Sequence, residues 1–287
     1  PSNCCGILEL CFDAAQRGFW EDLAAIRAQQ GYTLELIEQP QLAERHPYLN
    51  SERVEFAIAS QQDLQVQPIP LTQALVAAAQ QQGVKFIWST AVQDLEVDGE
   101  AEPNCCAVIT PQQVIETDWL ILTGGLGTTA LTQTLQKPVQ LMPVLGQAIR
   151  VRLPQAFQGE QQIPVLTAND VHVAPLGKQP DGAHDYWLGA TVEFPNACGD
   201  LPEQPNLLAQ IKQDAIAFCP GLQAATVIET WSGLRPRPVN RAAPIIEWLP
   251  SYDNVLVASG HYRNGVLLAP ATAHLVQQML TERLQCS

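Results

Sequence analysis

The chain has 287 residues, of which 46% are hydrophobic and 15% are charged, and a formal net charge of −14. This length and composition predict a globular protein with two domains. No apolar run in the sequence is long enough for a membrane span, so we predict no membrane insertion. An acidic chain repels phosphate groups, which argues against nucleic acid as a partner.

The eight cysteines show neither CxxC nor Cys/His spacing. Thiols without such spacing are typical of proteins in a reducing compartment. We therefore predict reduced cysteines, no metal site and a cytoplasmic location, and the alternatives are disulfides or a metal site.

In the N-terminal half, apolar residues recur at helical spacing over 12–30 and 71–82. The apolar run VKFIWST (84–90) predicts a strand. Short apolar segments around an Asp98–Gly99 turn predict a small antiparallel meander. The run WLILTGG (119–125) predicts a buried strand that ends in glycines just before another helix.

From residue 146 to 194 the sequence changes to separate strand-like segments with Pro, Gly and Asp between them, which is typical of antiparallel sheet. A helix over 207–218 and extended structure over 226–238 follow. The run NVLVASG (254–260) then predicts another buried strand, and helical spacing returns after the polar turn that follows it.

That polar turn, Gly-His-Tyr-Arg-Asn-Gly at 260–265, lies at the carboxyl end of a strand and at the start of a helix. In α/β folds ligands bind at such positions, because a helix start offers N–H groups and the positive end of the helix dipole. The two glycines let the backbone approach a ligand closely. The sequence therefore predicts a binding site that includes His261 and Arg263.

Arg235 precedes two prolines that restrict the local backbone. A rigidly held arginine is suited to paired hydrogen bonds with a carboxylate. The alternative is a surface arginine that pairs with Glu229 or Glu247. We expect that surface role for Arg237 and Arg241.

His172 alternates with Val171 and Val173, so its side chain is expected on the opposite face of a strand. A structural or exposed histidine is the alternative to a site role. The sequence contains no GxSxG motif and no evident pair of catalytic carboxylates, so we predict no hydrolytic nucleophile.

TWSGLRPRP followed by NVLVASGHYRNGVLLAPAT resembles the C-terminal half of the glycine oxidase/D-amino-acid oxidase family of FAD enzymes. The resemblance extends through WLILTGGLGTTAL, VLGQAIRVRL, DVHVAPLG and WLGATVEF, and more weakly to CGILEL, so it covers nearly the whole chain. It implies an α/β (α+β) fold, in which a Rossmann-like FAD-binding domain is interleaved with an antiparallel-sheet substrate domain. The expected ranges are 1–59 and 146–224 for the substrate domain, and 60–145 and 225–287 for the FAD-binding domain.

The resemblance further implies, for the complete protein, FAD-dependent oxidative deamination of a small amino acid, glycine or another, by hydride transfer to the flavin. Arg235 is then the carboxylate-binding residue, His172 stands where glycine oxidases place a tyrosine, and Arg263 completes the catalytic set. The implied cofactor-binding residues are Val92, Thr123, Gly124, Gly125, Gly260, His261, Arg263, Asn264, Gly265, Val266 and Leu267.

The sequence departs from the family in lacking a GxGxxG motif, which in the family holds the pyrophosphate of FAD. We therefore expect an FAD-binding domain without its first strand, and weak or absent FAD binding by this chain alone. One alternative is a flavin-free binding module without catalytic activity. Another is a sarcosine-oxidase-like N-methyl amino-acid oxidase, although that class usually links its flavin to a cysteine and none lies near 260–267. A homo-oligomer is left open.

Overall fold

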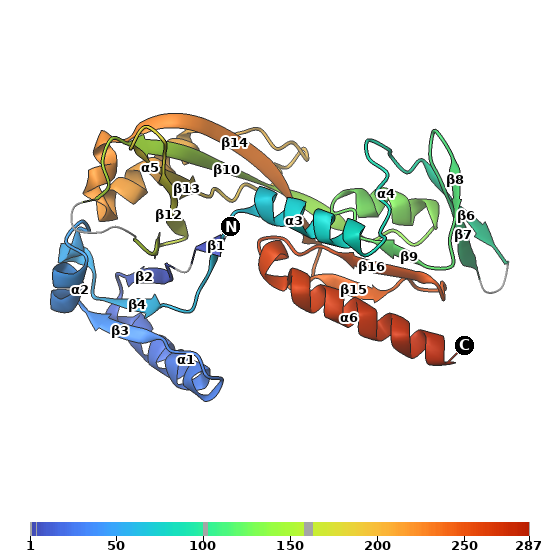
Figure 1. Ribbon diagram of the computed structural model, residues 1–287, viewed down its shortest axis with the longest axis horizontal. Helices are drawn as coiled ribbons and strands as arrows, with labels where there is room; N and C mark the ends of the chain where they lie inside the picture. The colour runs from blue at the N-terminus through green and yellow to red at the C-terminus, as the bar shows by residue number, and fades with distance from the viewer. Residues whose placement is uncertain (1, 4, 100–102, 158–162, 287) are drawn as a thin grey trace. The chain divides into compact units, whose positions relative to one another are not determined.

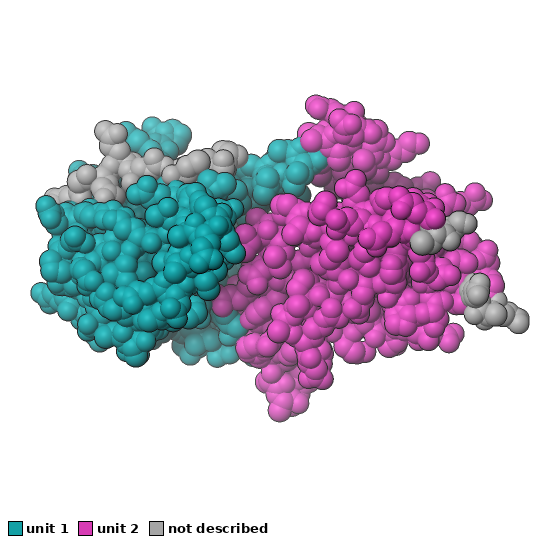
Figure 2. Space-filling model, turned by 90° about the horizontal axis from the view of Figure 1, so that it is seen from below, with its two compact units in different colours: residues 1–75, 146–192, 202–233 teal, residues 76–145, 193–201, 234–287 magenta. Residues whose placement is uncertain are grey.

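The computed structural model describes residues 2–3, 5–99, 103–157 and 163–286, which form a mixed α/β fold (Figure 1). Two compact units are present, and each is built from three separate stretches of the chain (Figure 2). Unit 1 comprises Pro1–Leu75, Gly146–Val192 and Pro202–Gly233, and unit 2 comprises Val76–Leu145, Glu193–Leu201 and Leu234–Ser287. The mixed α/β fold expected from the sequence is confirmed, and the four domain ranges stay a prediction.

An eight-stranded sheet includes most strands of unit 1, in the order β14-β10-β13-β12-β11-β2-β4-β3. Its strands are β2 (Ile7–Cys11), β3 (Glu35–Glu38), β4 (Phe56–Ser60), β10 (Leu141–Leu153), β11 (Val165–Ala168), β12 (Val171–Lys178), β13 (His184–Gly189) and β14 (Thr226–Pro238). Antiparallel pairing of β10, β11, β12 and β13 confirms the antiparallel sheet predicted after residue 146. β2 joins them by pairing in parallel with β11, and β1 (Ser2–Asn3) pairs separately with β5 (Gln65–Val66).

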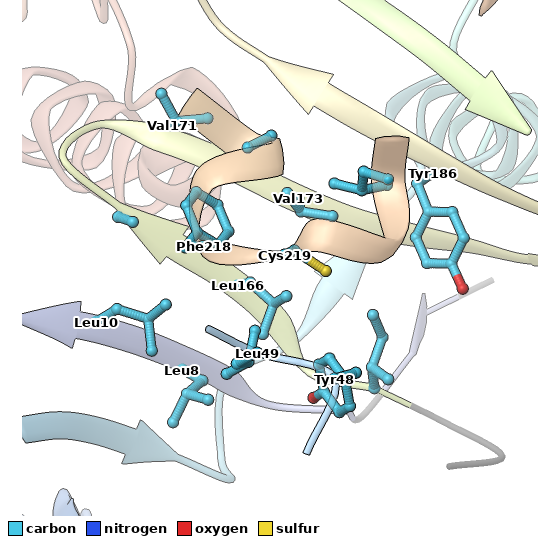
Figure 3. Close-up of a cluster of buried hydrophobic side chains, with 14 of the residues drawn as sticks. Leu8, Leu10, Tyr48, Leu49, Leu166, Val171, Val173, Tyr186, Phe218 and Cys219 are labelled. Atoms are coloured by element: carbon cyan, nitrogen blue, oxygen red, sulfur yellow. The ribbon is translucent and has the colours of Figure 1, made fainter. Parts of the chain in front are cut away.

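One face of this sheet carries the core of unit 1. Because side chains alternate across a strand, Leu8 and Leu10 of β2 share a face, as do Val171 and Val173 of β12, and all four are buried. Figure 3 shows these side chains with Phe218, which comes from the end of α5 (Pro205–Phe218). The side chains on the opposite face of these strands therefore lie outside this core.

Shorter helices complete unit 1: η1 (Ala14–Gln16), α1 (Arg17–Gln29), α2 (Gln39–Arg45), η2 (Ser51–Arg53) and η3 (Pro220–Ala224). The helical region predicted over 12–30 is confirmed, and it begins where the Asp13 carboxylate accepts a hydrogen bond from Ala15 N. Trp20 of α1 packs against buried Cys11 and Phe56. The predicted helix near 71–82 is also observed, as α3 (Pro68–Gln81), which runs from unit 1 into unit 2.

Unit 2 contains two three-stranded sheets. The first is the predicted meander, β6 (Asp94–Asp98), β7 (Asn104–Ile109) and β8 (Val114–Glu116). The second has the order β15-β16-β9, with β9 (Leu120–Leu122), β15 (Ile245–Trp248) and β16 (Val255–Ser259). Helices α4 (Gly127–Thr134) and α6 (Gly265–Cys286) complete the unit, and α6 lies alongside β15 and β16 (Figure 1). In the described part of the chain, no helix is long and apolar enough to cross a membrane.

The predicted strand over 84–90 is wrong. This segment is a turn and an irregular stretch, and Ile87 and Trp88 are 48% and 63% exposed. Trp88 stacks on Phe86 at a centroid distance of 5.1 Å. A strand needs a neighbour for its backbone hydrogen bonds, and an apolar run by itself does not supply one.

Candidate functional site

Two strand-to-helix junctions lie at one edge of the β15-β16-β9 sheet. β9 and β16 pair in parallel, so their carboxyl ends are at the same edge, where α/β folds bind ligands. Ser259 Oγ links the junctions by donating to the Gly125 carbonyl oxygen at 3.2 Å and accepting from Thr128 Oγ1 at 3.2 Å. The predicted cofactor residues at 123–125, 260–261 and 263–267 therefore belong to one edge of unit 2.

The turn between β16 and α6 is held by several backbone contacts. Gly260 and Tyr262 have positive φ angles of 77° and 53°, and Tyr262 N donates to the Pro236 carbonyl oxygen at 3.0 Å. His261 Nε2 lies 2.8 Å from Thr272 Oγ1. Burial lowers the pKa of His261. A neutral imidazole thus ties the turn to α6.

Substituting Gly260 by alanine is expected to lower the free energy of unfolding by about 2–3 kcal/mol. An added Cβ would lie 2.7 Å from Pro238 Cγ and 3.1 Å from Leu141 Cδ2, and the positive φ disfavours any side chain. Denaturant unfolding measures the change. Gly233→Ala is the control, because its Cβ would meet no atom within 4 Å. Equal stability of the two variants would contradict the prediction.

Arg235 lies near the end of β14, half-buried, in the same unit as this turn. Its Nη1 donates to the Leu145 carbonyl oxygen at 3.3 Å. Burial lowers the pKa of Arg235, and the Arg263 charge acts in the same direction, while Tyr262 and Glu193 oppose it. An arginine pKa stays far above neutral pH, so the site holds a fixed positive charge in a partly desolvated position.

The structure differs from the expectation for Arg237 and agrees with it for Arg241. Arg237 is half-buried, and its guanidinium lies over the rings of Phe194 and Tyr262, with distances of 5.1 and 5.5 Å to the ring centroids. It stabilises the turn by cation–π contact instead of forming the expected surface ion pair. Arg241 does pair with Glu247 at 2.9 Å, and both side chains are exposed.

The other predicted residues occupy different positions. His172 is in unit 1 on β12, where Val171 and Val173 face the core as expected. Its Nδ1 contacts Thr167 Oγ1, and its ring stacks on Trp187 at 6.4 Å with an interplanar angle of 15°. Arg263, Asn264, Val266 and Leu267 are exposed at the start of α6. Val92 is 37% exposed in the loop between α3 and β6.

Glu9 is a residue that the sequence analysis missed. It is opposite Thr167 in the β2–β11 register, and Thr167 is opposite His172 in the β11–β12 register, so the three side chains form a row on one face. Burial raises the pKa of Glu9 to about 7, and the Asp170 charge adds to this. The sequence signal that could have indicated Glu9 was a carboxylate within the otherwise apolar segment ILELC.

Glu9→Gln is expected to raise the free energy of unfolding at pH 8 by about 1 kcal/mol. The value is modest because the carboxyl is partly exposed. At pH 5 the substitution should change the free energy of unfolding little. The folded-state pKa of about 7 exceeds the ordinary 4.5, so the folded state binds more protons between these values. Wild-type stability should therefore fall as pH rises through this range, and the variant should lack that loss. Denaturant unfolding at both pH values tests this, with exposed Glu116→Gln as the control. The same pH dependence in Glu9→Gln and wild type would exclude the effect.

This chain is similar to several proteins named glycine oxidase. Glycine oxidase from Bacillus licheniformis is 25% identical over 96% of this chain and 69% of its own length. Glycine oxidase from Bacillus subtilis is 26% identical over 92% of this chain and 67% of its own length. Among solved structures, glycine oxidase from Bacillus cereus superposes with a TM-score of 0.79 at 22% identity, over 98% of this chain and 73% of the other, which supports the fold.

A match to a protein family also spans nearly the whole chain. Residues 2–279 match the family described as "DAO: FAD dependent oxidoreductase". That range takes in both glycine-ended strands of unit 2, Arg235 and the sheet of unit 1. This protein belongs to the DAO family of FAD-dependent oxidoreductases.

Proposed function

We propose that this protein carries out the FAD-dependent oxidative deamination of a small amino acid, glycine or another. The observation that carries the proposal is the half-buried Arg235 in the same unit as the Gly260–Leu267 turn, which opens helix α6. Two relatives with similar sequences are named glycine oxidase. The sum of the reaction is loss of a hydride from Cα and a proton from the amine, followed by addition of water to the imino acid and release of ammonia and an oxo acid.

FAD fits the residues at this edge on two grounds. Val266 and Leu267 are 50% and 77% exposed, so apolar side chains stand beside the helix start. An α-helix leaves its first N–H groups without partners inside the helix, and the bond from Leu268 N to the Asn264 carbonyl oxygen comes only after Gly265–Leu267. The exposed apolar side chains can pack against a planar ring. The N–H groups at the positive end of the helix stabilise the electron density that this ring gains on reduction. When bound, FAD supplies the acceptor for the hydride.

The chain's own residues would then position the amino acid. Arg235 binds the substrate carboxylate, since a guanidinium offers two parallel N–H donors to one carboxylate. A role for His172 of unit 1 as a second polar partner stays a prediction from the resemblance; its ring orientation is restricted by Thr167 and Trp187. Arg263 adds positive charge at the exposed turn. Positioning of this kind lowers the barrier without a protein nucleophile.

The test measures flavin and products together. FAD is supplied in excess, because binding by this chain alone is expected to be weak; the protein should then show flavin absorption and release ammonia and an oxo acid from at least one amino acid in a panel with glycine, alanine, proline and sarcosine. Formaldehyde and glycine from sarcosine alone would point instead to an N-methyl amino-acid oxidase, whereas methylamine and glyoxylate would come from oxidation at Cα. Failure to bind flavin even with FAD in excess would contradict activity of this chain and favour a binding module. The expected cytoplasmic location is kept as part of the proposal, and fractionation of the source cells checks it.

A further inference from the structure

Unit 1 contains a pocket of about 540 Å³ beside its buried core. This volume is within the range of small-molecule sites. Ala168, at the end of β11, and Phe218, at the end of α5, belong to that core (Figure 3), and Phe12 packs against it. All three residues line the pocket, so part of its wall is apolar.

Two opposite charges line the same pocket without forming an ion pair with each other. Arg53 ends η2 and Asp214 lies on α5, and both residues are exposed. Asp214 accepts a hydrogen bond from Gln210 Nε2 at 2.8 Å. Within the described part of the chain, the Arg53 guanidinium has neither a hydrogen bond nor an ion pair. Each of the two charges can therefore bind an opposite charge of a ligand.

The polar part of the lining is held by backbone contacts. Asn50 donates twice to the end of α5, from its backbone N to the Phe218 carbonyl oxygen at 2.9 Å and from Nδ2 to the Ala217 carbonyl oxygen at 3.3 Å. Asn169 lies in the two-residue turn between β11 and β12, where φ is 48° at Asn169 and 65° at Asp170, as in tight hairpin turns. A pocket with such fixed walls loses little conformational entropy when a ligand binds.

We propose that this pocket is a second amino-acid site, formed by unit 1 alone, which binds a free amino acid in its zwitterionic form. Arg53 pairs with the α-carboxylate and Asp214 with the α-ammonium. An apolar side chain of the ligand packs against Phe12 and Phe218. The site goes beyond the proposed function, which assigns the substrate carboxylate to Arg235.

Simpler ligands match only part of this lining. A carboxylate without an amine would be repelled by a chain of net charge −14 and by Asp214 in particular. An amine without a carboxylate would leave Arg53 unpaired beside a second positive charge. A zwitterion satisfies both side chains at once.

Titration calorimetry tests the site in the full chain carrying Arg235→Ala, without added FAD. Neither oxidation nor the carboxylate contact assigned to Arg235 then contributes to the signal. L-Phenylalanine should bind at least about fivefold more tightly than N-acetyl-L-phenylalanine, which lacks the ammonium, and than 2-phenylethylamine, which lacks the carboxylate. Equal affinities for the three compounds, or no measurable binding of L-phenylalanine, would overturn the inference.

Substitutions in the pocket, made in the same Arg235→Ala background, identify the residues responsible. Arg53→Ala and Asp214→Asn should each weaken L-phenylalanine binding at least about fivefold, and the fold should tolerate both changes because the side chains are exposed. Arg27→Ala and Asp22→Asn are the matched controls, since both residues are exposed on α1 and outside the pocket, and they should leave the affinity unchanged. Unchanged affinity in Arg53→Ala would overturn the inference.

The same titrations separate this inference from the proposed function. Binding of L-phenylalanine that is present in the wild type but lost in Arg235→Ala would assign the ligand to the site of the proposed function and would overturn the inference. Binding that persists in Arg235→Ala and is weakened by Arg53→Ala would support the second site, whether or not any amino acid is oxidised. The absence of oxidation would count against the proposed function alone.

Discussion

Replacing Arg235 by alanine is expected to lower kcat/KM for the oxidised amino acid by roughly thirtyfold to several thousandfold. The guanidinium is half-buried and its pKa is lowered chiefly by burial, so a carboxylate paired with it is held out of bulk water. Losing one partner of such a pair costs about 2–5 kcal/mol. Arg235→Lys should recover little, because an ammonium cannot form the paired contact.

The structure also provides the control for this experiment. Arg241 follows six residues later, but its pair with Glu247 is exposed, with side chains 40% and 51% accessible, so Arg241→Ala should change kcat/KM less than about twofold. Flavin absorption and thermal unfolding of Arg235→Ala should resemble those of the wild type. Near-normal turnover in a folded, flavin-loaded Arg235→Ala would remove the carboxylate-binding role.

The turn at 260–265 could be predicted because its chemistry is local. Gly260 and Gly265 border a polar insert between an apolar strand and a helix, and that order alone indicates a ligand-binding helix start. The observed parallel pairing of β9 with β16 confirms that both glycine-ended strands belong to one sheet. Alternation also predicted correctly that Val171 and Val173 turn away from His172.

Features that depend on distant neighbours could not be predicted in this way. The segment 84–90 has the composition of a strand but no strand beside it. Arg237 is half-buried and not on the surface as expected, because its guanidinium packs over the rings of Phe194 and Tyr262, which come from two other segments. Glu9 acquires its raised pKa from burial and from Asp170. Each outcome is decided by tertiary contacts, which periodicity and spacing do not contain.

A charged cluster of Arg150, Arg152 and Asp185 joins β10 and β13, and no sequence pattern indicated it. Asp185 is fully buried as a side chain and accepts hydrogen bonds from Arg150 Nε at 2.8 Å and Arg152 Nε at 2.7 Å. Arg152 and Asp185 are opposite each other in the strand register. The hydrogen bonds from Arg152, and then those from Arg150, hold the pKa of Asp185 below its usual value. One buried carboxylate thus compensates two guanidinium groups.

Asp185→Ala is expected to destabilise unit 1 by about 3 kcal/mol, near the lower end for a broken buried ion pair. The lower end applies because Arg150 and Arg152 keep 31% and 30% of their side-chain surface exposed, so water can partly solvate them after the carboxylate is lost. Denaturant unfolding followed by tryptophan fluorescence measures the change. Asp181→Ala is the matched control: Asp181 also pairs with Arg152, at 3.2 Å, but is 58% exposed, and its loss should cost less than about 1 kcal/mol.

The pH dependence of the same variant tests the cause. A folded-state pKa below the ordinary 3.8 means that the contribution of Asp185 is fully present above that value and is lost as pH falls through the folded pKa. The stability difference between wild type and Asp185→Ala should therefore be constant from pH 8 to 5 and shrink below pH 4. A difference that persists undiminished at pH 2–3 would show that the aspartate acts by packing alone. A difference that is absent at pH 7 would show that water already compensates both arginines, and that the cluster contributes nothing to the stability of the sheet.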